Sequence, residues 1–176
     1  MRELTMRLIH FRKGQCGVGL IEVLIAVLVL SIGFLGIAAL QAKALSNNNS
    51  AMARTQATIA SYSILDAMRA DRANALAGDY DTTVTYSASS TSNDGNVTAA
   101  SCSTSTSLSG LADAQVQAWC AGGGSGAPNG LAALGDGATG TIVCDSNGVC
   151  TITVTFDDGK ATGGEATQAV VTEAGI

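Results

Sequence analysis

Residues 17–40 read GVGLIEVLIAVLVLSIGFLGIAAL, and this stretch decides the architecture of the chain. The 23 residues from 18 to 40 contain a single charged side chain, that of Glu22. At about 1.5 Å of helical rise per residue, such a segment spans a hydrocarbon core of roughly 30 Å. The stretch therefore predicts a membrane-spanning helix over about residues 18–40, with an acid near its start.

The residues on either side of this segment differ in charge. Residues 1–17 hold four Lys or Arg and one Glu, whereas from Val18 onward five Lys and Arg stand against thirteen Asp and Glu, a formal net charge of −8. By the positive-inside rule, residues 1–17 stay in the cytoplasm and the rest is exported. An acidic body argues against nucleic-acid binding, which requires a basic face.

Other kinds of N-terminal signal fit this segment less well. A secretory signal peptide has a shorter apolar core followed by a cleavage site with small residues, and no such break follows residue 40. A lipoprotein signal would place Cys16 after the apolar run rather than before it. A plain single-pass anchor leaves Glu22 unexplained, although an acid inside a membrane segment is costly and by default indicates function.

The string of residues 17–22 resembles the prepilin signal. In that family a membrane peptidase cuts after a glycine, the new first residue is apolar and N-methylated, and the fifth residue is glutamate. The resemblance assigns the cut to the bond between Gly17 and Val18, methylation to Val18, and the fifth-position acid of the motif to Glu22. Phe or Met is the usual first residue, so valine is a departure. After cleavage, the α-ammonium of Val18 would lie one helical turn from Glu22, and a charge pair would offset the desolvation of both groups.

The helix is expected to continue well beyond the membrane segment. No proline precedes Pro128, and Gly78 is a natural C-terminal stop, which predicts one helix over residues 18–77, roughly 90 Å long. The polar residues 46–50 are its weak point, and the alternative is a break there followed by a separate head helix. We expect one apolar stripe on the second half, made of Leu45, Met52, Ile59, Leu65, Met68 and Leu76.

Further along, the helix resembles the PilV-type minor pilins of type IV pili, at residues 30–36, 39–41, 68–73 and 77–80. This resemblance covers residues 14–80 and resumes more loosely at Trp119 and over residues 151–158. It implies a type IV pilin-like α+β fold, in which the long N-terminal helix packs on a small antiparallel head at residues 78–176. It also implies a structural minor subunit that initiates or modifies pilus assembly, with a role in attachment or motility. The implied partners are prepilin peptidase, other minor pilins, the major pilin and the inner membrane, and the head would pass from the periplasm to the cell surface.

Within the head, a hairpin is the clearest element. Residues 141–144 and 149–156 read as strands, and residues 151–156 alternate threonine with apolar side chains, so one face is buried. A three-residue loop with Gly148 in the left-handed region closes such a hairpin. Residues 83–87 predict a short strand, 87–107 an exposed loop, 111–120 a short helix with Trp119 as a core anchor, and 167–172 a last strand.

Four cysteines follow the membrane segment, which predicts disulfides in an oxidising compartment. The hairpin register places Cys144 opposite Cys150, close enough for a disulfide. By elimination Cys102 pairs with Cys120, out of the three pairings that four cysteines allow.

No catalytic, cofactor or metal constellation stands out. The only histidine, His10, lies in the leader, and Asp157 and Asp158 lack the dense ligand pattern of a calcium site. We therefore expect a structural protein without enzymatic activity, cofactor or small-molecule substrate. Two alternatives remain open: a minor pseudopilin of a type II secretion system, and a membrane-anchored exported binding or enzymatic domain.

Overall fold

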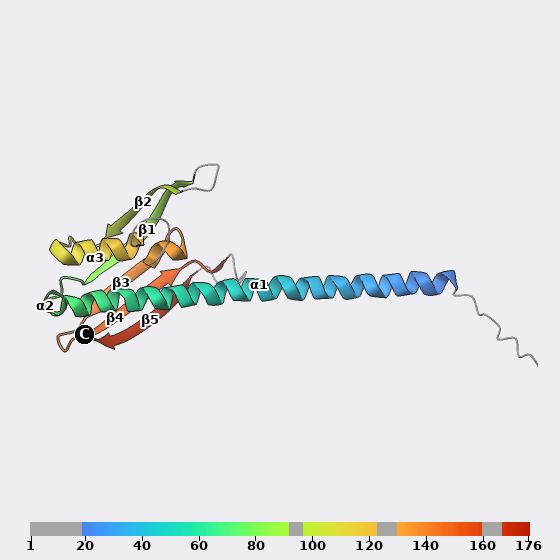
Figure 1. Ribbon diagram of the computed structural model, residues 1–176, viewed down its shortest axis with the longest axis horizontal. Helices are drawn as coiled ribbons and strands as arrows, with labels where there is room; N and C mark the ends of the chain where they lie inside the picture. The colour runs from blue at the N-terminus through green and yellow to red at the C-terminus, as the bar shows by residue number, and fades with distance from the viewer. Residues whose placement is uncertain (1–18, 92–96, 123–129, 160–166) are drawn as a thin grey trace, which may run out of the picture. The chain divides into compact units, whose positions relative to one another are not determined.

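The structure, a computed structural model, describes residues 19–91, 97–122, 130–159 and 167–176 (Figure 1). The chain divides between Ala42 and Lys43 into two units. The first contains the apolar part of the N-terminal helix, and the second contains the sheet and its covering helices.

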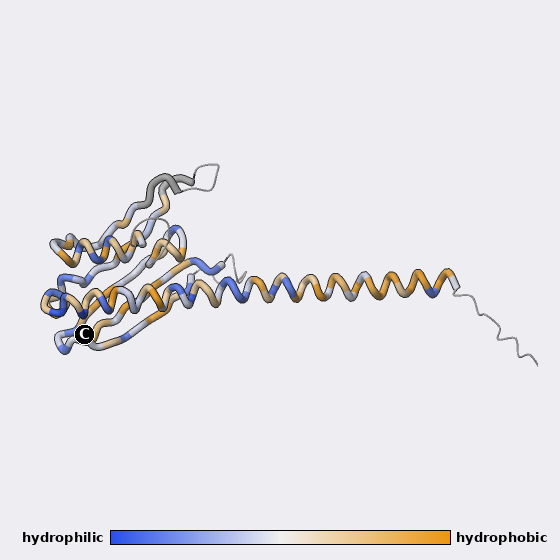
Figure 2. Tube along the Cα trace, in the orientation of Figure 1, coloured by the Kyte–Doolittle hydropathy of each residue, from blue (hydrophilic) through white to orange (hydrophobic). Residues whose placement is uncertain are grey.

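Helix α1 (Leu20–Ala70) is 51 residues long. Of the helices in the described ranges, it is the one that is long and apolar enough to cross a membrane, with a mean hydropathy of 2.9 over its best 18-residue window. Figure 2 shows this apolar stretch as nearly continuous orange. The helix assignment is unbroken through residues 46–50, so in this structure the polar run does not end the helix.

The long helix ends at Ala70, and Asp71 alone separates it from the short helix α2 (Arg72–Leu76). The Asp71 carboxylate accepts hydrogen bonds from Asn74 Nδ2 at 2.9 and 3.0 Å and lies 3.1 Å from the Tyr80 hydroxyl. Such side-chain bonds offer an alternative to the regular helix pattern. Gly78, with a φ of +86°, then closes α2, because its N–H and that of Asp79 cap the last carbonyl groups.

Among the described residues, five antiparallel strands form one sheet in the order β2-β1-β3-β4-β5. Their bounds are Thr82–Thr91 (β1), Val97–Thr104 (β2), Thr139–Cys144 (β3), Val149–Phe156 (β4) and Gln168–Gly175 (β5). Helix α3 (Gly110–Ala121) and the 3-10 helix η1 (Gly130–Leu134) separate β2 from β3.

The core of the second unit lies on one face of this sheet. Along β4 the side chains alternate, with Ile152, Val154 and Phe156 buried and the intervening threonines partly exposed. The buried face packs against both the C-terminal part of α1 and α3. The core consists mainly of Ala57, Ile64, Leu65, Met68, Tyr80, Val84, Val116, Trp119, Leu131, Ile142, Ile152, Val154 and Phe156. A long helix packed on a small antiparallel sheet is the pilin-like α+β fold that the sequence predicts.

The expected single stripe on α1 is wrong. Leu65 and Met68 are buried, whereas Leu45, Met52 and Ile59 are 61–63% exposed. At 3.6 residues per turn, a seven-residue repeat drifts by only about 20°, so the first three residues stay in line. Met68 is nine residues beyond Ile59 and therefore lies about 180° around the helix.

The expected exposed loop over residues 87–107 is also wrong. There β1 continues to Thr91 and pairs with β2, from Val84 opposite Thr104 to Thr91 opposite Val97. Strand β2 consists mostly of serine, threonine and alanine, so its sequence offers little apolar surface to bury. Strand β2 is therefore held mainly by main-chain hydrogen bonds to β1 and by the disulfide of Cys102. Neither interaction produces a hydrophobic pattern in the sequence.

Other expectations in the head are confirmed. Helix α3 occupies the predicted position, and Trp119 is 5% exposed. The β3–β4 hairpin has Cys144 opposite Cys150, and Gly148 has a φ of +82°. Outside the head, Asp66 and Arg69 of α1 form an exposed ion pair, with 3.1 Å between Arg69 Nη1 and Asp66 Oδ1.

Candidate assembly site on the N-terminal helix

Glu22 lies in the first turn of α1, and its side chain is exposed. The main-chain N–H groups of Glu22 and Val23 point back to the Gly19 carbonyl at 2.9 and 3.4 Å. A carboxylate at this end is favourable for a helix, because the first turn carries the positive end of the helix dipole. The geometry leaves Glu22 able to accept an ammonium or other donor from its own chain or from a partner.

The apolar residues that follow Glu22 have nothing in the chain to bury them. Leu24, Leu28 and Phe34 are 59–64% exposed, and none of the best membrane-span window is buried. Exposed apolar surface on this scale marks a contact with lipid or with another protein. Gly17 and Val18, where the expected cleavage and methylation fall, lie outside the described residues.

A second apolar surface lies on the C-terminal part of α1. We call Leu45, Met52 and Ile59 the heptad seam, since they recur every seven residues and face away from the core. Sequence reasoning found these residues but assigned them to the wrong face. The signal that distinguishes them is the seven-residue spacing, which is typical of a helix-to-helix contact.

The disulfides join the pairs that the sequence predicts. Cys144 and Cys150 are bonded with their Cα atoms 4.0 Å apart, which closes the β3–β4 hairpin. Cys102 of β2 is bonded to Cys120 of α3, with 6.1 Å between the Cα atoms. In the hairpin tip, hydrogen bonds from the Val149 N–H and from Asn147 lower the pKa of the Asp145 carboxyl.

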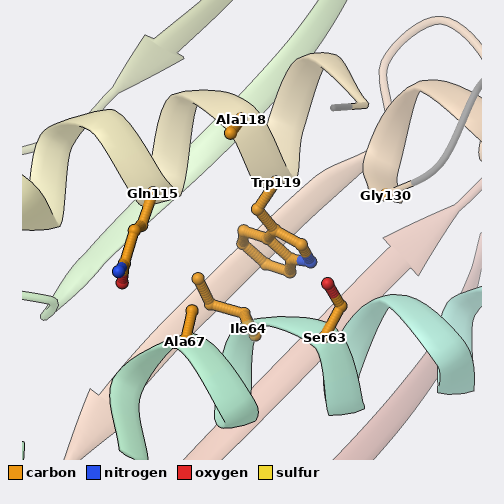
Figure 3. A pocket seen from close by; sticks show the side chains of 7 residues that line it. All are labelled: Ser63, Ile64, Ala67, Gln115, Ala118, Trp119 and Gly130. Atoms are coloured by element: carbon orange, nitrogen blue, oxygen red, sulfur yellow. The ribbon is translucent and has the colours of Figure 1, made fainter. Parts of the chain in front are cut away.

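A shallow cleft of about 290 Å³ separates α1 from α3 (Figure 3). It is lined by Ser63, Ile64, Ala67, Gln115, Ala118, Trp119 and Gly130. The Trp119 indole reaches across it and donates Nε1–H to the Ala60 carbonyl at 2.9 Å. None of these lining residues is a histidine, cysteine or acid, so none of them could act as a general base toward the Ser63 hydroxyl.

In the described ranges, no group of three or more His, Cys, Asp or Glu side chains is placed to hold a metal ion. The two neighbouring acids after β4 point to different partners. Asp158 Oδ2 accepts from the Ser50 hydroxyl at 2.5 Å, and Asp157 Oδ1 accepts from the Gly159 N–H at 2.8 Å.

Two sets of hydrogen bonds at buried side chains were not expected from the sequence, one between Ser50 and Asp158 and one around Tyr80. Ser50 and Asp158 are 108 residues apart in sequence, and no local pattern relates them. Tyr80 is fully buried, with its hydroxyl 2.5 Å from Gln115 Oε1 and 3.1 Å from Asp71 Oδ2. Burial, followed by the Asp71 carboxylate, raises the pKa of Tyr80 to about 12. The one signal that the sequence offered for this network is an aromatic side chain, Tyr80, between Asp79 and Asp81.

Residues 12–38 match a family described as the prokaryotic N-terminal methylation motif. This motif indicates a type IV pilin-like prepilin, a structural class that is processed by prepilin peptidase and assembles with pilins in the inner membrane. The matched residues include the expected cleavage position and Glu22. No curated protein and no solved structure matches the chain.

Proposed function

We propose that the chain is a minor subunit of a type IV pilus, of the PilV type, that initiates or modifies pilus assembly. The observation that carries the proposal is the methylation motif over residues 12–38, which overlaps the start of a helix whose apolar part is entirely exposed. A disulfide-bonded head follows that helix. Such a chain requires partners for its helix and an oxidising compartment for its head.

Processing would begin in the inner membrane, with residues 1–17 in the cytoplasm and the head in the periplasm. Prepilin peptidase cleaves between Gly17 and Val18, and the amine of Val18 is methylated. The free amine and Glu22 then form a charge pair within one subunit or between two. Both charges lie at the end of an apolar helix, so each loses water contacts when the helix is surrounded by lipid or by other helices. Pairing the two charges offsets this desolvation cost.

During assembly the helix leaves the membrane and enters a bundle of helices from other minor pilins and the major pilin. The exposed residues from Leu20 to Leu40 replace lipid contacts with helix contacts in that bundle. The heptad seam offers a second apolar surface, on the part of α1 that carries the head. A low-abundance subunit at the pilus surface or tip would affect attachment or motility.

Mass spectrometry of the protein isolated from membranes tests the processing step. The expected mature chain begins at Val18 with one added methyl group. An intact Met1 terminus, or a cut after Leu40, would overturn the prepilin assignment.

Glu22→Ala tests the docking step. We expect normal cleavage, because Gly17 and the basic residues Arg12 and Lys13 before it are unchanged, together with impaired recovery in sheared pili. The matched control is Glu173→Ala, which removes an exposed acid from β5 and leaves the motif intact. Equal recovery of the two variants in sheared pili would contradict the role of Glu22.

A minor pseudopilin of a type II secretion system is the closest alternative, since the methylation motif and apolar helix suit it equally. Neighbouring genes distinguish the two: pilus genes support the pilus subunit, and secretion genes support the pseudopilin. A membrane-anchored exported binding domain is the remaining alternative, and it predicts an uncleaved N-terminus.

A further inference from the structure

Ser50 is the first residue of α1 that is buried. Every described residue before it is exposed or partly exposed, and the next buried residue is Ala57. Ser50 is 7% exposed and donates its hydroxyl to Asp158, whose side chain is 2% exposed. A single polar contact therefore marks the place where the helix first meets the head.

The neighbouring residues of α1 are poorly suited to a helix. Serine and asparagine occupy all five positions 46–50, and their side chains compete with the main chain for hydrogen bonds. Nearby hydroxyls behave in this local way, since Thr55 and Thr58 donate to the carbonyls of Ala51 and Arg54. Ser50 instead donates to Asp158.

One turn later, a second bond joins the same helix to the same part of the sheet. Arg54 Nη2 donates to Gln168 Oε1 at 2.8 Å. Asp158 follows the end of β4 and Gln168 begins β5, so two consecutive turns of α1 hold the two sides of the β4–β5 connection. The Arg54 bond is exposed, whereas the Ser50 bond is buried and is the stronger constraint.

We propose that the Ser50–Asp158 hydrogen bond is a latch that keeps residues 46–50 helical, and that α1 opens locally at these residues when the bond is lost. The latch has a consequence for the heptad seam, which rests on the proposed function. Leu45 and Met52 flank the polar run, so they stay on one line only while the residues between them are helical. Asp158 is thus a positioning residue for a surface on the opposite side of the helix.

Amide hydrogen exchange tests the latch, measured in detergent micelles on the whole protein as it is isolated from membranes. In Ser50→Ala we expect amides 48–54 to exchange about tenfold faster, because the loss of a buried hydrogen bond favours local opening. Alanine has a higher helix propensity than serine, so propensity alone predicts the opposite sign. Ser50→Thr, which keeps the hydroxyl, should stay within about twofold of the original chain.

The matched control is Thr55→Ala, which removes an exposed hydroxyl that bonds only within the helix. We expect its exchange over residues 48–54 to be unchanged or slower. Unchanged exchange in Ser50→Ala would overturn the latch. Equal acceleration over residues 60–70 would also overturn it, since the bond would then stabilise the whole head rather than the polar run.

Recovery in sheared pili separates the latch from its consequence. Reduced recovery of Ser50→Ala but not of Thr55→Ala supports a latched helix as a requirement for incorporation. If Ser50→Ala opens the helix locally but is fully recovered in sheared pili, a latched helix is not required for incorporation. The latch itself would still stand. Failure of the Glu22→Ala test bears on the proposed function alone, because hydrogen exchange in the isolated subunit does not involve a pilus.

Discussion

The apolar part of α1 and the part that belongs to the head differ in where their stability comes from. Within residues 20–40 no side chain is buried, so the segment depends on lipid or on other helices. Within residues 43–70 one face is buried in the chain's own core, through Ala57, Ile64 and Met68 among others. Changes in the first part should therefore alter membrane and partner contacts, whereas changes in the second should alter the free energy of unfolding of the head.

The largest expected change in the free energy of unfolding of the head comes from replacing Trp119. Trp119→Ala removes a buried ring and its bond to Ala60, so the head should lose about 3–5 kcal/mol of unfolding free energy. Pulse proteolysis in urea measures this loss. The paired change Leu28→Ala, in the exposed apolar part, should leave the urea midpoint of the head unaltered. A comparable shift from Leu28→Ala would show that the head depends on that segment.

The two disulfides sharpen the contrast within the head. Their partners are 18 and 6 residues apart, and loop-closure entropy assigns about 3 and about 2 kcal/mol to them respectively. Replacing Cys102 and Cys120 with alanine should therefore destabilise the head more than replacing Cys144 and Cys150. Urea unfolding of the two double variants checks this order. The reverse order would mean that β2 contributes little to the stability of the head.

Alkaline pH should weaken the head through Tyr80. Its pKa is about 12 in the fold, against 10 for a solvent-exposed tyrosine, so the folded chain retains a proton that the unfolded chain releases. The free energy of unfolding is unaffected below pH 10 and should fall by about 2–3 kcal/mol as the pH rises to 12. Tyr80→Phe should flatten this part of the pH profile. An unchanged slope in that variant would assign the loss to other groups.

The smallest effect concerns the Asp66–Arg69 pair. Both side chains are largely exposed, so Asp66→Asn should change the free energy of unfolding by no more than about 0.5 kcal/mol. Added salt should make no further difference in the variant. A larger loss would indicate that Asp66 supports Arg69 in its bond to the Gly175 carbonyl.

Local patterns predicted much of this fold, and long-range contacts account for most of what they missed. The hydrophobic pattern predicted the helix and the strands of the β3–β4 hairpin, and Gly148 predicted the turn between those strands. That turn set the register, from which the pairing of Cys144 with Cys150 could be predicted. Strand β2 was missed because it is held by main-chain bonds to β1 and by Cys102 rather than by apolar side chains. Of the candidate site, the motif around Glu22 was readable from adjacent residues. The partner of Ser50 was not, because 108 residues separate it from Asp158.

The close packing around the indole gives the protein a built-in optical reporter. Trp119 is the only tryptophan, and a Cβ at Gly140 would overlap its ring, while one at Gly130 would overlap its carbonyl oxygen. The ring thus lies in close contact with β3 and bonds to α1, at the junction of α1, α3 and β3. Its emission wavelength and quenching should follow the closure of that junction during refolding, without a label and without a signal from the membrane segment.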